Sequence, residues 1–259
     1  MTETADTTAL RGELEKRTAS PKEATVRDLL DRLEPRLAET LPAAIGVERF
    51  RRVALNELYR NPELYDCSPH SLVGALLYSA QLGLEPGPLG HVYLVPFKKQ
   101  VTWILGYRGM IELAYRSGQL KDLTAVLVHE GDRFDYELGT SPKIKHVPDG
   151  PAGEREIVAA YSVARLKTGG APFVVTFPED WEKAQKASAA GRLNKGPWVE
   201  HRPAMILKTP IRRLQRFLPQ TAGFAEAVTR DEAPAPEVDD VSGELEMPVS
   251  DAEPTEADA

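Results

Sequence analysis

Apolar residues recur at helical spacing in the first part of the chain. Five of them after residue 23 fall on one face of a helix and predict the first helix: Val26, Leu29, Leu30, Leu33 and Leu37. A second helix is expected over residues 46–59. Ser68 followed by Pro69 is typical of an N-cap and a first helical residue, and it predicts a third helix that ends at Gly83.

The middle of the chain alternates apolar and polar residues over short runs, which predicts β-hairpins. Three strand pairs are expected: 91–96 with 100–105, 123–129 with 134–138, and 157–166 with 172–177. Further helices are expected over 108–117, 179–189, 199–218 and 221–229. Hairpins among helices predict an α+β fold with a small antiparallel sheet. Alternating βαβ units are absent, which argues against a doubly wound nucleotide-binding fold.

Charge is distributed unevenly over the 259 residues, whose net charge is −7. Residues 231–259 hold eleven acidic residues and no Lys or Arg, which leaves 28 acidic and 32 basic residues in the rest. We therefore expect a disordered N-terminus over 1–22, a mildly basic folded domain over 23–230, and an acidic disordered tail over 231–259. The single cysteine, Cys67, excludes an internal disulfide. No apolar run is long enough to span a bilayer, so a soluble cytoplasmic protein is expected.

The strongest candidate chemistry is a basic segment near the end of the predicted domain. It contains one acid, Glu200, and seven cations: Arg192, Lys195, Arg202, Lys208, Arg212, Arg213 and Arg216. In a helix, Leu207, Ile211, Leu214 and Leu218 form an apolar stripe, with Lys208, Arg212 and Arg216 aligned beside it. Such a ridge suits a phosphate backbone, although an ordinary solvated face has the same pattern. Pro210 is expected to kink or restart the helix with Thr209 as its cap, which would move Lys208 out of line.

Other candidates lie in the hairpin regions and beside the basic segment. Lys98 and Lys99 at a hairpin tip are either phosphate contacts or solubilising turn residues. Arg108 opens a helix, where a cation is disfavoured unless an anion faces it, so either a carboxylate or a phosphate is expected nearby. Gly106 and Gly109 would let another backbone approach closely. Trp198 follows Gly-Pro in a basic loop and is a candidate for base stacking or positioning, whereas Trp103 and Tyr93 are expected in the core.

Signatures of enzymes are weak in this sequence. The glycines near residue 87 lack the lysine of a phosphate-binding loop, so no ATP site and no other cofactor is expected, with divalent cations at most modulating ligand binding. His129, Glu130, Asp132 and Asp135 cluster in sequence, but their spacing matches no known metal-binding loop. A solvated hairpin turn is the favoured interpretation, and no catalytic residue is predicted.

Two blocks of the sequence resemble the RecT family, phage-type recombinases that anneal complementary single strands of DNA, and more remotely the phage Red beta proteins. The first block, residues 81–117, reads QLGLEPGPLGHVYLVPFKKQVTWILGYRGMIELAYRS. The second, residues 194–219, reads NKGPWVEHRPAMILKTPIRRLQRFLP. The resemblance extends over about residues 62–227, and two distant blocks in the same order are more specific than either alone.

The resemblance implies binding of single-stranded DNA and its annealing without ATP in homologous recombination. It further implies a homo-oligomer, either a ring or a helical filament, acting in a bacterial host cell on single strands and annealed duplex. A companion exonuclease or a host single-strand binding protein is an implied partner. The acidic tail would compete with DNA or recruit such a partner. Together with the basic segment, the resemblance makes the following residues candidates for DNA binding: Lys98, Lys99, Arg108, Lys195, Trp198, Arg202, Lys208, Arg212, Arg213 and Arg216.

Two alternatives are kept open. A passive single-strand binding protein needs the same basic groove, although five consecutive strands of an OB barrel are not predicted. A metal-dependent nuclease would use Glu130, Asp132 and Asp135.

Overall fold

The computed structural model describes residues 21–43, 45–188, 196–219, 221–231, 233 and 234. The longer helices are α2 (Pro21–Thr40), α3 (Val47–Arg60), α4 (Pro69–Gln81), α5 (Tyr107–Tyr115), α6 (Pro178–Ala187), α9 (Arg202–Leu214) and α10 (Ala222–Arg230). Short helical segments are η1 (Pro62–Asp66), α8 (Pro197–Glu200) and η2 (Gln215–Phe217). The strands are β1 (Val92–Phe97), β2 (Gln100–Leu105), β3 (Leu120–His129), β4 (Arg133–Glu137), β5 (Lys143–Val147), β6 (Ile157–Leu166), β7 (Phe173–Thr176) and β8 (Ala233–Pro234). This is the predicted α+β class.

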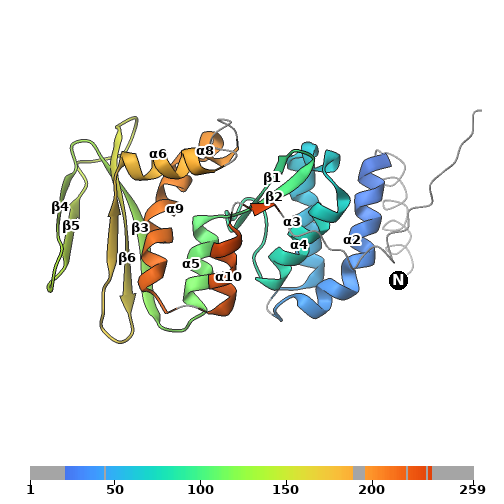
Figure 1. Cartoon of the computed structure of the whole chain (residues 1–259), viewed down its shortest axis with the longest axis horizontal. Coiled ribbons are helices and arrows are strands. Elements are labelled where there is room, and N and C mark those ends of the chain that lie inside the picture. The colour runs from blue at the N-terminus through green and yellow to red at the C-terminus, as the bar shows by residue number, and fades with distance from the viewer. Residues whose placement is uncertain (1–20, 44, 189–195, 220, 232, 235–259) are drawn as a thin grey trace, which may run out of the picture.

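The N-terminal helices α2, α3 and α4 stand beside the β1–β2 hairpin at one end of the molecule (Figure 1). All five apolar residues that predicted the first helix are buried. Helix α2 begins at Pro21, so the predicted end of N-terminal disorder at residue 22 is two residues too late. Residues 1–20 lie outside the described part. Helix α4 begins at Pro69 as predicted, and its residues from Ser71 to Ala80 are all buried.

Two of the three predicted hairpins are confirmed and one is wrong. Strand β1 pairs with β2, and β6 pairs with β7. Strand β3, however, pairs with β6 rather than with β4, and β4 pairs with β5. The described strands therefore form three antiparallel sheets, β1-β2-β8, β3-β6-β7 and β4-β5, where one was predicted. The pattern of alternation located six of the eight described strands and missed β5 and β8, and it does not fix which distant strand each one joins.

Helix α9 lies at the centre of the C-terminal half and packs against β3, β6 and β7. The two-stranded sheet β4–β5 lies on the other side of this sheet, at the far end of the molecule (Figure 1). The predicted restart at Thr209 is wrong, because α9 runs through Pro210 without interruption. Thr209 donates its hydroxyl to the Met205 carbonyl at 3.3 Å instead of capping a new helix. Pro210 is buried, and its ring costs the helix one backbone hydrogen bond.

The chain crosses back to the N-terminal half at its described C-terminal end. Asp231 is buried, and β8 pairs with β2 through Thr102 and Trp103. The predicted start of the acidic tail at Asp231 is therefore too early, while residues 235–259 lie outside the described part. Within the described residues, no helix is both long and apolar enough to cross a membrane.

Candidate nucleic-acid interface

The two blocks that predicted the family meet at one groove of about 950 Å³. Strand β1, the turn at Gly87–Gly90 and the start of α5 supply one wall, and α8 with the first turn of α9 supplies the other. The end of α3 and the start of η1 complete the lining and contribute the carboxylates of Glu57 and Glu63. The lining residues most relevant to a ligand are Arg60, Tyr93, Tyr107, Arg108, Val199 and His201. Residues more than 100 positions apart thus form a common surface.

Glycines in the first block allow this wall to pack tightly. A Cβ atom on Gly106 would lie 2.0 Å from the Gly90 carbonyl oxygen, and one on Gly109 would lie 2.3 Å from the His91 carbonyl oxygen. No side chain fits at either position, which confirms the predicted close backbone approach. The Gly106 amide donates to the His91 carbonyl at 2.8 Å and fixes the start of α5 against β1. Arg108, two residues later, is thereby held at the edge of the groove.

The two walls are joined by an aromatic contact. The rings of Tyr93 and His201 are stacked, with centroids 5.4 Å apart. Tyr93 is half-buried and lines the groove, so its predicted place in the core is wrong, whereas Trp103 is buried as expected. Burial raises the pKa of the Tyr93 phenol and also raises the pKa of the Glu57 carboxyl at the groove. The groove is thus a partly desolvated site with aromatic and charged lining.

Arg108 has no carboxylate partner within the part of the chain that the structure describes. Its Nε donates to the Tyr107 hydroxyl at 3.2 Å, and its guanidinium lies 5.8 Å from the centre of the Tyr107 ring. One terminal nitrogen is 3.5 Å from the Leu89 carbonyl oxygen. The side chain is exposed, so of the two predicted partners the carboxylate is not found among the described residues, and the phosphate stays a prediction.

A second hollow of about 610 Å³ lies on the other side of α8, between α6 and α9. It brings together five of the predicted residues: Trp198, Lys208, Arg212, Arg213 and Arg216. Lys183 adds a further cation, whereas Asp180 and Asp231 are the acids in its lining. Cations therefore outnumber carboxylates in this hollow, as an anion-binding surface requires.

Asp231 organises the floor of this cationic hollow, and its side chain is fully buried. Its carboxylate accepts from the Leu105 amide at 2.9 Å, from Lys208 Nζ at 2.8 Å and from Arg212 at 3.0 Å. The Lys208 side chain is only 4% exposed, whereas that of Arg212 is 44% exposed. Lys208 therefore supports the core rather than the exposed ridge on which it was predicted. Its alignment with Arg212 on α9 is nevertheless retained, because both contact the same carboxylate.

Arg213 is held at the rim by Asp180. The guanidinium donates to Asp180 Oδ1 at 2.7 Å, and Oδ2 of the same carboxylate accepts from the Phe177 amide at 2.9 Å at the start of α6. The pKa of Asp180 is lowered, because these hydrogen bonds outweigh the opposing effect of burial. The ion pair ties the start of α6 to the last turn of α9, and the Arg213 side chain stays 43% exposed.

The other predicted residues are spread over the surface or withdrawn from it. Trp198 is 3% exposed, so the predicted base stacking on its ring is wrong in this structure. Lys98 and Lys99 are exposed at the β1–β2 tip and adopt positive φ angles of 50° and 61°, as a tight two-residue hairpin turn requires. Arg202 is exposed, and it lies 3.4 Å from Gln185. Lys195 lies outside the described residues.

Comparison with known proteins agrees with the convergence of the two blocks. A sequence profile described as the RecT family matches residues 48–244. Protein RecT of Escherichia coli strain K12 is 44% identical over 209 residues, which cover 77% of each chain. The chain belongs to the RecT family. The uncharacterized protein YqaK of Bacillus subtilis strain 168 is 24% identical over 242 residues, covering 91% of this chain and 82% of YqaK.

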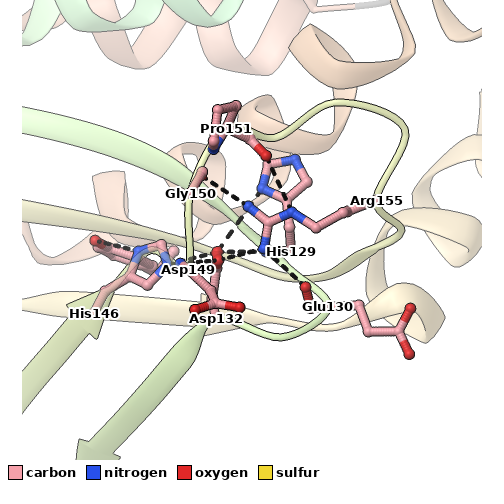
Figure 2. A network of polar contacts seen from close by, with 9 residues as sticks. His129, Glu130, Asp132, His146, Asp149, Gly150, Pro151 and Arg155 are labelled. Carbon is pink, nitrogen blue, oxygen red and sulfur yellow. Dashed lines mark hydrogen bonds and ion pairs between the residues drawn. The ribbon is translucent and has the colours of Figure 1, made fainter.

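The sequence of the turn at residues 129–132 suggested a metal site. In this RecT family member the turn holds a buried ion-pair network instead (Figure 2). The Asp132 side chain is 1% exposed and accepts from the amides of His129 and Asp149, from His146 and from Arg155, at 2.7–3.0 Å. The amide of Asp149 contributes most to lowering the pKa of Asp132. The favoured solvated turn holds for Glu130 and Asp135, which are exposed, but it is wrong for the Asp132 carboxylate. Among the described residues, no group of three or more His, Cys, Asp or Glu is placed to hold a metal ion.

Sequence reasoning missed three residues that shape the RecT family surface. Asp231 was assigned to the tail because its neighbours are acidic and proline-rich, and no local pattern marked it. Asp180 was visible as the third residue of α6, a position typical of a capping box, but its pairing with Arg213 depends on the tertiary fold. His201 was hidden because its partner, Tyr93, is remote in sequence.

Proposed function

We propose that this protein binds single-stranded DNA and anneals complementary strands in homologous recombination, without ATP. The observation that carries the proposal is the meeting of the two RecT-like blocks at one groove, with Arg108 at its edge and the cationic hollow on the opposite side of α8. Both surfaces offer guanidinium groups on rigid helices, which suit phosphate oxygens. Membership of a family that contains Protein RecT supports the same role.

The mechanism needs no chemical step. Phosphates of one strand would contact Arg108, Arg212, Arg213 and Arg216, because these side chains are wholly or partly exposed. Neutralising phosphates reduces the repulsion between two strands, and base pairing then supplies about 1.4 kcal/mol per stacked step. The protein would accelerate pairing by holding a strand extended with its bases available. Contacts to phosphate and sugar carry no sequence information, so sequence preference should be weak.

The wider assembly is part of the same proposal. Ring or filament formation would extend the groove across subunits and hold a strand longer than one subunit can span. A companion exonuclease or a host single-strand binding protein would deliver the strand, and divalent cations would modulate phosphate binding. The acidic segment after residue 234 would compete with DNA for the cationic hollow or recruit such a partner.

The direct experiment follows two complementary fluorescent oligonucleotides as they pair, with and without protein and without nucleotide. The proposal expects pairing well above the spontaneous rate, with both strands intact afterwards. Binding without acceleration would replace annealing by passive protection of single strands. Magnesium-dependent shortening of a labelled strand would instead indicate a nuclease.

Salt dependence tests the electrostatic part separately. If about five phosphates are neutralised per subunit, the logarithm of affinity should fall with the logarithm of salt concentration with a slope near −3.5 for single strands. A flat response would contradict binding through phosphates.

A further inference from the structure

Phe217 is among the most exposed large apolar side chains of the described residues, at 65%. It lies in η2, directly after Arg216 and one turn beyond Arg213, at the end of the helix that supplies the cationic hollow. Phe177 is a second exposed aromatic residue, at 42%, and it immediately precedes α6. A phenyl ring left in water is unfavourable, so an exposed ring beside a binding surface is a candidate contact.

The ion pair between α6 and α9 brings Phe177 into the same neighbourhood. Asp180 accepts from the Phe177 amide with one carboxylate oxygen and from Arg213 with the other. The backbone of Phe177 is thus separated from the Arg213 guanidinium by a single carboxylate. The two exposed aromatic residues therefore lie on the two segments that the Asp180–Arg213 ion pair joins, Phe177 at the start of α6 and Phe217 just after Arg216.

Single-stranded nucleic acid presents two kinds of surface at once, a charged backbone and the flat faces of unpaired bases. Arginines alone bind the backbone of any polyanion, whereas an adjacent exposed ring adds binding that depends on the bases. Stacking is tolerant of sequence because every base has a π-face. A protein that holds strands of any sequence therefore benefits from this combination.

We propose that Phe217, assisted by Phe177, is a stacking platform for nucleobases of the strand whose phosphates contact Arg213 and Arg216. This inference rests on the proposed binding of single-stranded DNA and specifies which part of the strand the end of α9 contacts. It also replaces Trp198, whose ring is buried, as the aromatic contact of the basic helix.

The test compares two probes of equal length and charge, an oligo-dT strand and a strand of abasic residues, for wild type and F217A. Truncation of a stacking ring should weaken oligo-dT binding about tenfold and leave binding of the abasic strand unchanged. The salt slope of F217A should equal that of wild type, because no cation is removed. F217W should retain oligo-dT affinity, and F177A should show a smaller loss of the same kind.

The matched control is L138A. Leu138 is 69% exposed, and it follows β4, on the other side of the β3-β6-β7 sheet from α9. Its truncation removes a similar exposed apolar surface and should leave both probes unaffected. R216Q provides the opposite signature, a loss on both probes with a salt slope shallower by about 0.7.

Three outcomes would overturn the inference while leaving DNA binding in place. These are unchanged oligo-dT affinity in F217A, an equal loss on the abasic strand, or a loss that follows a changed oligomeric state, which would make Phe217 a contact between copies of the chain. Failure of the wild-type protein to bind oligo-dT would overturn the proposed function itself, and the stacking platform with it.

Discussion

Asp231 and Asp132 are both buried carboxylates, and they organise two separate parts of the molecule in different ways. Asp132 accepts hydrogen bonds from two amides, a histidine and an arginine, and Arg155 further donates to the carbonyls of Glu130, Gly150 and Pro151 (Figure 2). Asp231 joins β2 to α9, but the Arg212 side chain that it holds stays 44% exposed, beside the exposed Arg216. One network is closed upon itself, and the other presents cations to solvent.

This difference shows that a buried carboxylate can either stabilise the fold or position side chains that bind a ligand. A closed network satisfies every polar group, so its removal should affect the fold alone. An open network positions cationic side chains whose remaining N–H groups can donate hydrogen bonds to a ligand. The variants below should therefore separate the two regions, since changes near Asp132 should leave DNA binding intact and changes near Asp231 should not.

The largest effect is expected for D231N. The variant leaves the buried Lys208 ammonium without its carboxylate, and loss of one partner from a buried ion pair costs about 3–5 kcal/mol of the free energy of unfolding. Chemical denaturation should report this loss. The double variant K208M/D231L, which removes both charges, should recover most of the stability. A D231N protein as stable as wild type would show that the pair contributes little.

The next effect concerns DNA affinity. Replacing Arg212, Arg213 and Arg216 together by Gln should make the salt slope of single-strand binding shallower by about 2, because each neutralised phosphate contributes about 0.7. The control is the triple Gln variant of Arg133, Lys143 and Lys145, exposed cations of the β4–β5 sheet near the Asp132 network. Similar losses in both triple variants would mean that DNA affinity depends on the net charge of the protein rather than on the cationic hollow.

D132N should lower the melting temperature by several degrees at neutral pH without changing DNA affinity. The folded pKa of Asp132 lies below its unfolded value, so its carboxylate stabilises the fold above about pH 4 and loses this effect as the pH falls further. The difference in melting temperature between wild type and variant should therefore shrink below about pH 4. A constant difference across this range would contradict a role for the ionised carboxylate.

The smallest effect is expected for D180N, which releases Arg213 from its carboxylate while keeping a side-chain oxygen to cap α6. Without the competing carboxylate, the contact between Arg213 and a phosphate should strengthen and single-strand binding should tighten a few-fold, with a salt slope close to that of wild type because the number of contacting cations is unchanged. D122N is the control, because it releases Arg165 on an exposed part of the β3–β6 sheet. Weaker binding in D180N would instead mean that Asp180 holds Arg213 in its binding position.

Local patterns predicted much of the fold, because helices and tight hairpins depend on neighbours in sequence. The stripe from Val26 to Leu37 identified α2, and the Lys98-Lys99 tip identified the β1–β2 hairpin. The pairing of β3 with β6 was missed, because the β4–β5 pair separates these two strands in the sequence. The His129 amide, which donates to Asp132 at 2.9 Å, marks where β3 ends.

Most residues of the candidate site were predicted from the sequence, but their arrangement in space was not. The basic segment did supply Arg212, Arg213 and Arg216 to one hollow, as the spacing suggested. Periodicity could not show that Lys208 is buried, because that depends on Asp231, a residue in an acidic and proline-rich context. Nor could it show that Trp198 is covered while Phe217 is exposed, since both lie in similar apolar-basic surroundings.

Photo-crosslinking tests most directly whether DNA follows the groove where the two blocks meet. The photoreactive residue p-benzoylphenylalanine would replace Val199, which lines the groove and is 52% exposed, or Val147, which is 47% exposed on the β4–β5 sheet. Irradiation with a labelled oligo-dT strand should give covalent adducts from position 199 and few from position 147. Equal yields from the two positions, or adducts from position 147 alone, would contradict the account.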